Sequence, residues 1–466
     1  KLTCKNRKKK TQWEFTMLTK TDFMKYAECP VYLWMAKHRP DLLPEDTPDK
    51  RRIFAMGNEV DLLSRRLFSG GIEVGGYNME GWKNTKKLMQ SLASILFQPT
   101  AVAGPLTCRA DILSRNSEVN AWDINEVKMA TSVKKEYPYD VAFQRTCFEN
   151  AGVKIDRMNL VHINNQYVRR GEIEPEKLFV SEDITDLALE KTEEVKELIS
   201  LALKILDRRE KPDEKILALC PNPKTCEYLK IYLESIGKKY ELPIIDEITD
   251  KAGIKEKLQE LQYPLYFLDY ETYSAAIPPF DGTRPYQNIP FQYSLGVKDA
   301  PGADTRYMEF LARKFENPVP ELLAQLKRES GNKGTIIVWN ESFEKGCNDE
   351  MARMEPKYAE FLKDVNNRIF DLMVIFKIKN QLYTRNAFQA SASLKMVLPV
   401  ICPELSYEML AIQGGQEASA SWPILTDAGI PESEKDKLAE NMLKYCKRDT
   451  EAMVGILEKI KREIGA

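Results

Sequence analysis

An apolar run that carries two acidic residues near its end is the feature that most constrains the fold of this chain. The run, "YPLYFLDYETYSA", covers residues 263–275, and its apolar and aromatic content predicts a buried strand. Side chains of a strand alternate between its faces, so Phe267, Asp269 and Glu271 would share one face. A divalent cation between the two carboxylates would relieve their repulsion and their loss of hydration. If the strand instead ends at Asp269, both acids are simply solvated.

Histidine is nearly absent from the chain, and this narrows the chemistry that it can perform. The 466 residues include two, His38 and His162, so neither a His-based triad nor a His-rich zinc site is expected. Hydrolysis would have to depend on carboxylates, Lys, Tyr and bound metal ions. The formal net charge of -2 neither favours nor excludes a nucleic-acid partner, because a basic groove can coexist with an acidic remainder.

Cysteine usage and hydropathy bear on the compartment. The nine cysteines are scattered through a large chain, which is typical of a protein of the reducing cytoplasm. No apolar run approaches the ~20 residues that a membrane helix needs. We therefore expect a cytoplasmic protein without a membrane partner.

A charged segment near the middle divides the chain into two halves of comparable size. Residues 241–261 are interpreted as a linker helix. Residues 17–240 and 262–466 each mix apolar strand-like runs with amphipathic helices, which predicts an α/β fold in each half. Residues 1–16 lack an initiator Met and contain a basic run, so we interpret them as a solvated tail, with Met17 a candidate start.

Three further segments of the second half carry acids, and they follow the first motif along the chain in a fixed order. The apolar strand in "GTIIVWNESFEKGCND" is followed by Glu344, and "NNRIFDLMVIFK" offers Asp371. The helix in "NMLKYCKRDTEAMVGILEKI" places Tyr445 and Asp449 four residues apart, hence on one face. Each motif alone is short, and each residue could instead be a core Tyr or an exposed acid.

Taken together, D-x-E at a strand end, N-x-x-F-E, and Y-x-x-x-D on a late helix resemble the three exonuclease motifs of the RNase H-like, DnaQ-type superfamily, in its Tyr subclass. The resemblance covers about residues 262–466. It implies an RNase H-like α/β domain with a mixed sheet and a 3'-5' exonuclease activity. Its substrate would be a single-stranded end of DNA or RNA.

The resemblance also implies a site with two Mg²⁺ or Mn²⁺ ions, about 3.5 to 4 Å apart in such sites. Asp269, Glu271 and Asp449 would hold the ions, and Tyr445 would orient the attacking water. The superfamily usually has Asp where this chain has Glu344. The longer side chain could still reach a metal, and Asp371 is the alternative ligand.

The first half contains a second acidic pattern. Asp111 ends the strand-like run "LTCRADILS", and Glu126 and Lys128 alternate onto one face of the strand in "WDINEVKMAT". This order resembles the PD-(D/E)xK signature of RecB-like nucleases, whose fold is that of restriction endonucleases. One or two metal ions would lie between the acids, with Lys128 stabilising developing negative charge. The alternative is a Glu126–Lys128 ion pair at the solvent end of a half-buried strand.

Two helices extend this resemblance. "YDVAFQRTCFENAG" resembles the later helix of those nucleases, with Gln144 matching their Gln and Phe148 where Tyr is usual. "MGNEVDLLSRRLF" resembles their first helix, with Glu59 or Asp61 in the place of an acid or His that binds metal.

Some RecB-like relatives bind an iron-sulfur cluster through four cysteines, one before and three after the nuclease core. Cys29, Cys220 and Cys226 match three of these positions, while Ile231 and Tyr232 occupy the region of the fourth. Complete Cys ligation is normal for such clusters. Two interpretations therefore stay open, an iron-sulfur cluster on three cysteines, or leftover or zinc-binding cysteines.

The whole chain resembles an uncharacterised bacterial family that combines these two nuclease domains. We therefore predict a metal-dependent nuclease with its main site in the second half. Tyr270, Tyr273 and Tyr286 could stack on bases beside that site, or belong to the core. The rival hypothesis is a nucleic-acid-binding scaffold in which one or both sites have decayed, which Glu344, Phe148 and the missing fourth Cys favour. The sequence names no protein partner.

Overall fold

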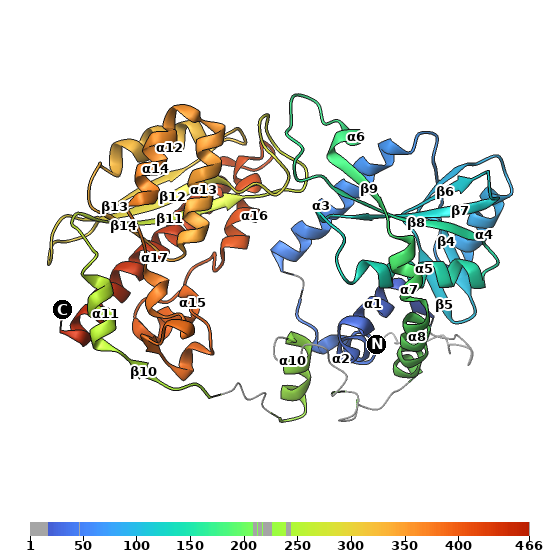
Figure 1. The fold of residues 1–466 in the computed structure, drawn as a ribbon, viewed down its shortest axis with the longest axis horizontal. Helices are drawn as coiled ribbons and strands as arrows, with labels where there is room; N and C mark the ends of the chain where they lie inside the picture. Colours follow the sequence, from blue (N-terminus) through green and yellow to red (C-terminus); the bar gives the residue numbers. More distant parts are fainter. Residues whose placement is uncertain are drawn as a thin grey trace, which may run out of the picture. The chain divides into compact units, whose positions relative to one another are not determined.

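The computed structural model describes residues 17–45, 47–207, 212, 217, 226–238 and 244–465. The basic tail predicted at residues 1–16 lies outside the described residues. The chain forms two compact units, coloured blue to green and green to red in Figure 1. The segments of unit 1 fall within Lys1–Glu45, Phe54–Asn165 and Ile173–Glu241. Those of unit 2 fall within Asp46–Ile53, Gln166–Glu172 and Leu242–Ala466.

Two short segments of the first half thus group with unit 2, because arginines bind them to the loop after residue 273. Arg52 donates to the Ser274 carbonyl at 3.2 Å. Arg169 donates to the carbonyls of Pro278 and Pro279 at 3.1 and 2.7 Å.

Unit 2 is built on a mixed five-stranded sheet, ordered β13-β12-β11-β14-β15. The strands are β11 (Leu265–Tyr273), β12 (Ile289–Lys298), β13 (Arg306–Leu311), β14 (Thr335–Val338) and β15 (Ile369–Asp371). β12 is antiparallel to β11 and β13, whereas β14 and β15 are parallel to β11. A separate pair joins β10 (Ile248–Thr249) to β16 (Tyr383–Thr384). The α/β fold with a mixed sheet predicted for this half is confirmed.

The helices of unit 2 cover both faces of this sheet (Figure 1). They are α11 (Lys251–Leu258), α12 (Val319–Glu329), α13 (Glu341–Met354), α14 (Ala359–Asn367), α15 (Leu394–Ile401), α16 (Gly415–Thr426) and α17 (Glu432–Ile464). The predicted alternation along β11 is confirmed, because its side chains enter two different cores. Leu268 and Tyr270 pack with α12, α13 and α14, whereas Leu265 and Phe267 pack with α11, α15 and the later turns of α17.

Unit 1 contains a six-stranded sheet, ordered β2-β3-β6-β7-β8-β9. Its strands are β2 (Ile72–Glu73), β3 (Ile95–Phe97), β6 (Ile112–Asn116), β7 (Ala121–Lys128), β8 (Ile155–Ile163) and β9 (Phe179–Asp183). β7 is antiparallel to β6 and parallel to β8. A second sheet joins β1 (Leu18–Thr19), β5 (Leu106–Arg109) and β4 (Thr100–Ala103). Unit 1 is therefore also an α/β unit with mixed pairing, as predicted.

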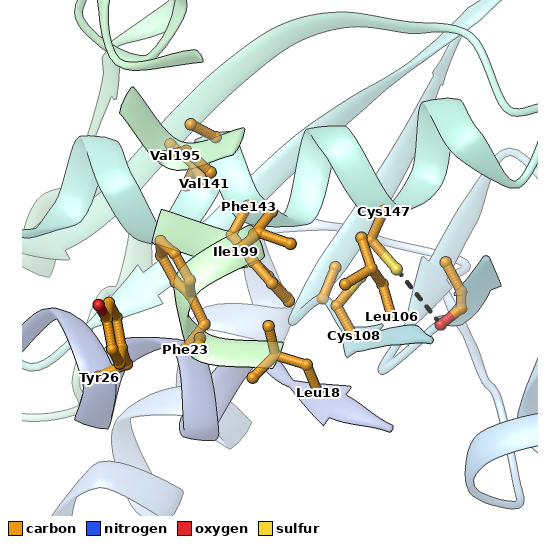
Figure 2. Packing of buried hydrophobic residues seen from close by; sticks show 14 of the residues in the cluster. Leu18, Phe23, Tyr26, Leu106, Cys108, Val141, Phe143, Cys147, Val195 and Ile199 are labelled. Carbon is orange, nitrogen blue, oxygen red and sulfur yellow. Dashed lines mark hydrogen bonds between the residues drawn. The ribbon is translucent and has the colours of Figure 1, made fainter. Parts of the chain in front are cut away.

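Helices α1 and α5 of unit 1 pack through a buried aromatic contact, shown in Figure 2. The rings of Phe23 and Phe143 are stacked with their centroids 4.7 Å apart. A capping box starts α1, because the Thr19 side chain accepts from the backbone of Asp22 while the Asp22 carboxylate accepts from that of Thr19. The capping box therefore stabilises the start of α1, whose first residue is Lys20. The helices of this unit are α1 (Lys20–Glu28), α2 (Pro30–His38), α3 (Pro48–Ser64), α4 (Asn78–Met89), α5 (Tyr137–Asn150), α6 (Pro175–Leu178), α7 (Thr185–Glu190), α8 (Thr192–Asp207) and α10 (Glu227–Ser235).

None of the helices that the structure describes combines the length and apolar character needed to cross a membrane.

Candidate metal centre

The end of β11 meets the middle of α17, and this contact creates a cluster of possible metal ligands. Carboxylate oxygens of Asp269 and Glu271 and the sulfur of Cys446 all lie within 4.8 Å of one another. The Cys446 thiol donates weakly to Asp269, with 3.7 Å between Sγ and Oδ2. The two acids lie on one face of the strand, as predicted. Sequence reasoning passed over Cys446, although it lies inside the Y-x-x-x-D motif.

The predicted pair on α17 faces the same cluster. Asp449 accepts a hydrogen bond from the hydroxyl of Tyr407, and Tyr445 lies close enough to Asp449 to influence its pKa. Both Tyr445 and Asp449 are buried. Tyr407 was not predicted, because it lies in an irregular segment whose local sequence has no pattern that would point toward α17.

Glu344, which stands where the superfamily usually has Asp, is buried near Asp269. It lies in the first turn of α13 and is 3% exposed. Its Oε2 atom has no hydrogen-bond partner among the described residues. Burial, together with the nearby Asp371 charge, raises the pKa of Glu344 to about 8. A negative charge on Glu344 in turn raises the pKa of Asp269, so the two carboxylates are close enough to repel.

Asp371, the alternative ligand, is already engaged. Its Oδ1 accepts from the backbone N–H of Met373 at 3.0 Å, and its Oδ2 pairs with Lys377 at 2.8 Å. Between the two alternatives, the structure therefore favours Glu344, whose Oε2 is available to a ligand.

The acids of this cluster raise one another's pKa. Burial and the charges of Asp449 and Glu271 raise the pKa of Asp269 well above its usual range. Burial raises the pKa of Asp449 to about 6, against the opposing effects of its tyrosine partners and Lys395. The Lys395 ammonium donates to the Gln413 carbonyl at 2.6 Å and lies 5.8 Å from the ring centre of Tyr445. The positive charge of Lys395 therefore offsets the negative charge of the acidic cluster only from a distance.

The predicted acidic residues of unit 1 also come together, but their carboxylates form ion pairs with lysines. Glu126 is 1% exposed, and its Oε1 accepts from both Lys20 and Lys128 at 2.7 Å. Its Oε2 accepts from Gln144 at 2.7 Å. Lys128 also pairs with Asp140 at 2.6 Å. The structure thus brings the predicted Glu126, Lys128 and Gln144 together and adds Lys20 and Asp140, which sequence reasoning missed.

Asp111 lies at the edge of this network. Its Oδ2 accepts from the backbone N–H of Val127 at 2.8 Å, and Gln98 donates to its Oδ1 at 3.4 Å. The same Gln98 amide group is 3.5 Å from Asp61. Of the two alternatives on α3, Glu59 is exposed, whereas Asp61 is half-buried and lies beside Gln98, so the structure favours Asp61. One helical turn has about 3.6 residues, so these two side chains, two positions apart, point in different directions.

The two clusters differ in their suitability for a metal ion. In unit 2 a buried Glu344 oxygen has no partner within the described part of the chain, and several acids repel one another. A divalent cation would compensate for both. In unit 1 both oxygens of Glu126 already accept hydrogen bonds from cationic or amide groups. A metal ion at Glu126 would therefore compete with the two lysines at Oε1 or with the Gln144 amide at Oε2.

Comparisons with known proteins bear on the second unit. Residues 266–393 match the family described as a domain of unknown function, DUF2779. The "Uncharacterized protein MG366 homolog" of Mycoplasma pneumoniae is 25% identical over 256 residues, which cover 50% of this chain and 37% of that protein. The "Uncharacterized protein MG366" of Mycoplasma genitalium is 27% identical over 218 residues, covering 44% of this chain and 33% of that protein. The chain thus spans about a third of the length of these relatives.

The matched segment covers one part of the candidate centre. It begins within β11 and includes Asp269, Glu271 and Glu344, but it ends before Cys446 and Asp449. The centre is therefore composed of residues from inside and outside the family match.

The predicted cysteine site is described only in part. Cys29 and Cys226 are the N-cap residues of α2 and α10, and Cys220 lies outside the described residues. The helices pack through a stack of Tyr32 on Tyr228 with ring centroids 3.6 Å apart. The iron-sulfur cluster stays a prediction.

The three tyrosines proposed to stack on bases have different surroundings. Tyr270 is buried and donates to Asn348 at 3.0 Å, so it belongs to the core and its stacking role is wrong. Tyr273 is half-buried and packs its ring edge-on against Trp422 at 5.6 Å. Tyr286 donates its backbone N–H to the Ala275 carbonyl at 2.8 Å, which stabilises the loop after β11.

Proposed function

We propose that the chain is a metal-dependent nuclease whose second unit hydrolyses phosphodiester bonds of DNA or RNA. The observation that carries the proposal is the Oε2 atom of buried Glu344, which has no hydrogen-bond partner among the described residues. It lies near Asp269, whose carboxylate also meets the charges of Glu271 and Asp449. Holding such a cluster in a fold costs free energy unless a cation binds it. Bound Mg²⁺ or Mn²⁺ ions would supply activation of water and neutralisation of the phosphate charge. Tyr445, which lies close to Asp449 on α17, would orient the attacking water.

The arrangement of the strands supports the same proposal. The resemblance implies an α/β domain with a mixed sheet, and the sheet of unit 2 combines antiparallel and parallel pairs. The resemblance also implies two acids at a strand end and a last acid on a late helix, and β11 and α17 carry these acids. We further propose 3'-5' polarity and a single-stranded end as substrate, both of which rest on that resemblance. A cytoplasmic location is proposed from the scattered cysteines.

For unit 1 we propose two alternative functions, a second nuclease site or nucleic-acid binding without cleavage. The assembly of Asp111, Glu126, Lys128 and Gln144 supports a second nuclease site of the PD-(D/E)xK type. The pairing of Glu126 with Lys20 and Lys128 supports instead a unit that binds nucleic acid without cleaving it, as the scaffold hypothesis holds for one site.

An assay with end-labelled oligonucleotides tests both units. Single- and double-stranded DNA and RNA, labelled at the 5' or the 3' end, are incubated with the protein and Mg²⁺ or Mn²⁺. We expect Asp269→Asn to lower the rate by at least about 10²-fold, since it removes charge at the reacting centre. Glu126→Gln separates the two functions proposed for unit 1, because it lowers the residual activity only if that unit cleaves.

A matched control is Glu329→Gln. Glu329 is a half-buried acid of unit 2 that accepts from Tyr293 and Gln325 and belongs to neither cluster. Its removal should leave the rate unchanged. Wild-type protein that cleaves none of the substrates with either metal would overturn the nuclease proposal and leave the binding scaffold.

A further inference from the structure

Cys446 is the part of the candidate centre that hydrolysis by carboxylates and Tyr445 does not use. It is a buried residue of α17 with no disulfide partner among the described cysteines. Among the described residues, Asp269, Glu271 and Cys446 are the group whose potential ligand atoms lie within 4.8 Å of one another. A thiol that only filled space in the core would have no reason to lie against two carboxylates.

The spacing suits a shared metal ion. A tetrahedral Zn²⁺ binds Cys sulfur at about 2.3 Å and carboxylate oxygen at about 2.1 Å, which puts the two ligand atoms about 3.6 Å apart. The observed separation of Cys446 Sγ from Asp269 Oδ2 is 3.7 Å. Coordination at this edge would therefore need little movement of either side chain.

A second observation, independent of the cysteine, also points to a cation here. Glu344 Oε2 is buried and lacks a hydrogen-bond partner among the described residues. Glu344 belongs to α13, whereas Cys446 belongs to α17, and both act on Asp269. Groups on three separate elements, β11, α13 and α17, thus meet at Asp269.

We propose that the Cys446 thiolate is a direct ligand of one divalent ion at this centre and that it makes the centre prefer thiophilic ions such as Zn²⁺ and Co²⁺ over Mg²⁺. Thiolate ligands favour such ions, whereas carboxylates alone suit Mg²⁺ and Mn²⁺. On binding, the S–H proton leaves to solvent and the sulfur lone pair forms the metal bond. The inference rests on the metal centre of the proposed function, but not on a nucleic-acid substrate.

Cobalt titration of the full chain tests this inference without measuring activity. Protein freed of metal by a chelator is titrated with Co²⁺, and the sulfur-to-cobalt charge-transfer absorption is followed in the near ultraviolet. We expect the band in wild-type protein and its loss in Cys446→Ser, with Co²⁺ binding at least ten-fold weaker. Mg²⁺ should need at least a hundred-fold excess to displace Co²⁺. The control is Cys402→Ser, which removes another buried free thiol of unit 2 and should keep the band.

The possible outcomes separate the two proposals. A band that keeps its full wild-type intensity in Cys446→Ser, or Co²⁺ binding without a band in active wild-type protein, overturns the thiolate ligand and leaves the nuclease intact. A band in protein that cleaves no oligonucleotide supports the ligand and overturns the nuclease. If Cys446→Ser fails to fold, X-ray absorption of wild-type protein loaded with Zn²⁺ decides, since a Cys ligand gives a sulfur neighbour at about 2.3 Å.

Discussion

The two units each bring acids from a strand and a helix together, yet they balance the charge in opposite ways. In unit 1, Glu126 lies between Lys20 and Lys128 at hydrogen-bond distance. In unit 2, Asp269 and Glu344 repel each other, and Lys395 donates to a backbone carbonyl. The comparison shows that an acidic motif by itself does not define a metal site. The positions of neighbouring lysines decide whether the carboxylates of such a cluster are neutralised within the folded protein or left to repel one another.

The ionisation of the two clusters reflects this difference. Burial works to lower the pKa of Lys128, but Glu126 and Asp140 outweigh it, so that the net pKa lies well above the usual range. In unit 2 burial and mutual repulsion both raise the pKa of Asp269. The first cluster is therefore held as ion pairs, whereas the second resists ionisation.

The largest expected effect comes from removing a countercharge in unit 1. Lys128→Met leaves the buried carboxylates of Glu126 and Asp140 with less compensation, and breaking a buried pair costs about 3 to 5 kcal/mol. We expect the free energy of unfolding, measured by urea denaturation, to fall by this amount. Lys444→Met, which breaks an exposed pair with Glu440, should change it by less than about 0.5 kcal/mol. A loss of stability no larger than that of the control contradicts the idea of a charge-balanced cluster.

Metal binding should stabilise unit 2 by a somewhat smaller amount. At a Mn²⁺ concentration 100 times the Kd, mass action raises the unfolding free energy by about 2.7 kcal/mol. Thermal denaturation with and without Mn²⁺ measures this gain. Asp269→Asn should abolish it and Glu126→Gln should retain it. The reverse pattern would mean that the metal binds in unit 1.

The pH dependence of stability offers a third comparison. The pKa of Glu344 rises from 4.5 to about 8 on folding, so between these values the folded chain binds more protons than the unfolded chain. Stability without metal should therefore fall as pH rises from 4.5 to 8, by at most about 1.4 kcal/mol per pH unit for this group. Denaturation in the presence of a chelator measures the slope. Glu344→Gln should make the slope shallower but not abolish it, since Asp269 and Asp449 also have raised pKa values. Glu329→Gln should leave the slope as steep as in wild type.

The smallest effect concerns Lys395. Its positive charge lowers the pKa of Glu271 and Asp449, and it opposes a bound cation in the same way. Lys395→Met should therefore tighten Mn²⁺ binding by roughly three- to ten-fold, about 1 kcal/mol. Isothermal titration calorimetry measures the affinity, with Lys345→Met as the control because Lys345 pairs with Glu341 on α13. Weaker binding in Lys395→Met would show that Lys395 organises the centre rather than opposing it.

Local periodicity made much of the fold and part of the site predictable. The two-residue alternation of a strand placed Asp269 and Glu271 on one face of β11, and the helical period placed Tyr445 and Asp449 together on α17. Where one helix offered two acids, the same local reasoning left Glu59 and Asp61 as alternatives, because the sequence does not reveal which side of α3 is exposed.

The sequence by itself determined which strands and helices carry acids, since periodic burial depends on neighbours only a few residues away. Only the tertiary structure decided which charges those acids meet. Lys20 and Glu126 are 106 residues apart along the chain, and Cys446 and Asp269 are 177 apart. No local pattern encodes such contacts, because they arise when separate helices pack onto a sheet. In this protein the packing left one acidic cluster neutralised by lysines and the other with a buried carboxylate oxygen that no described residue satisfies.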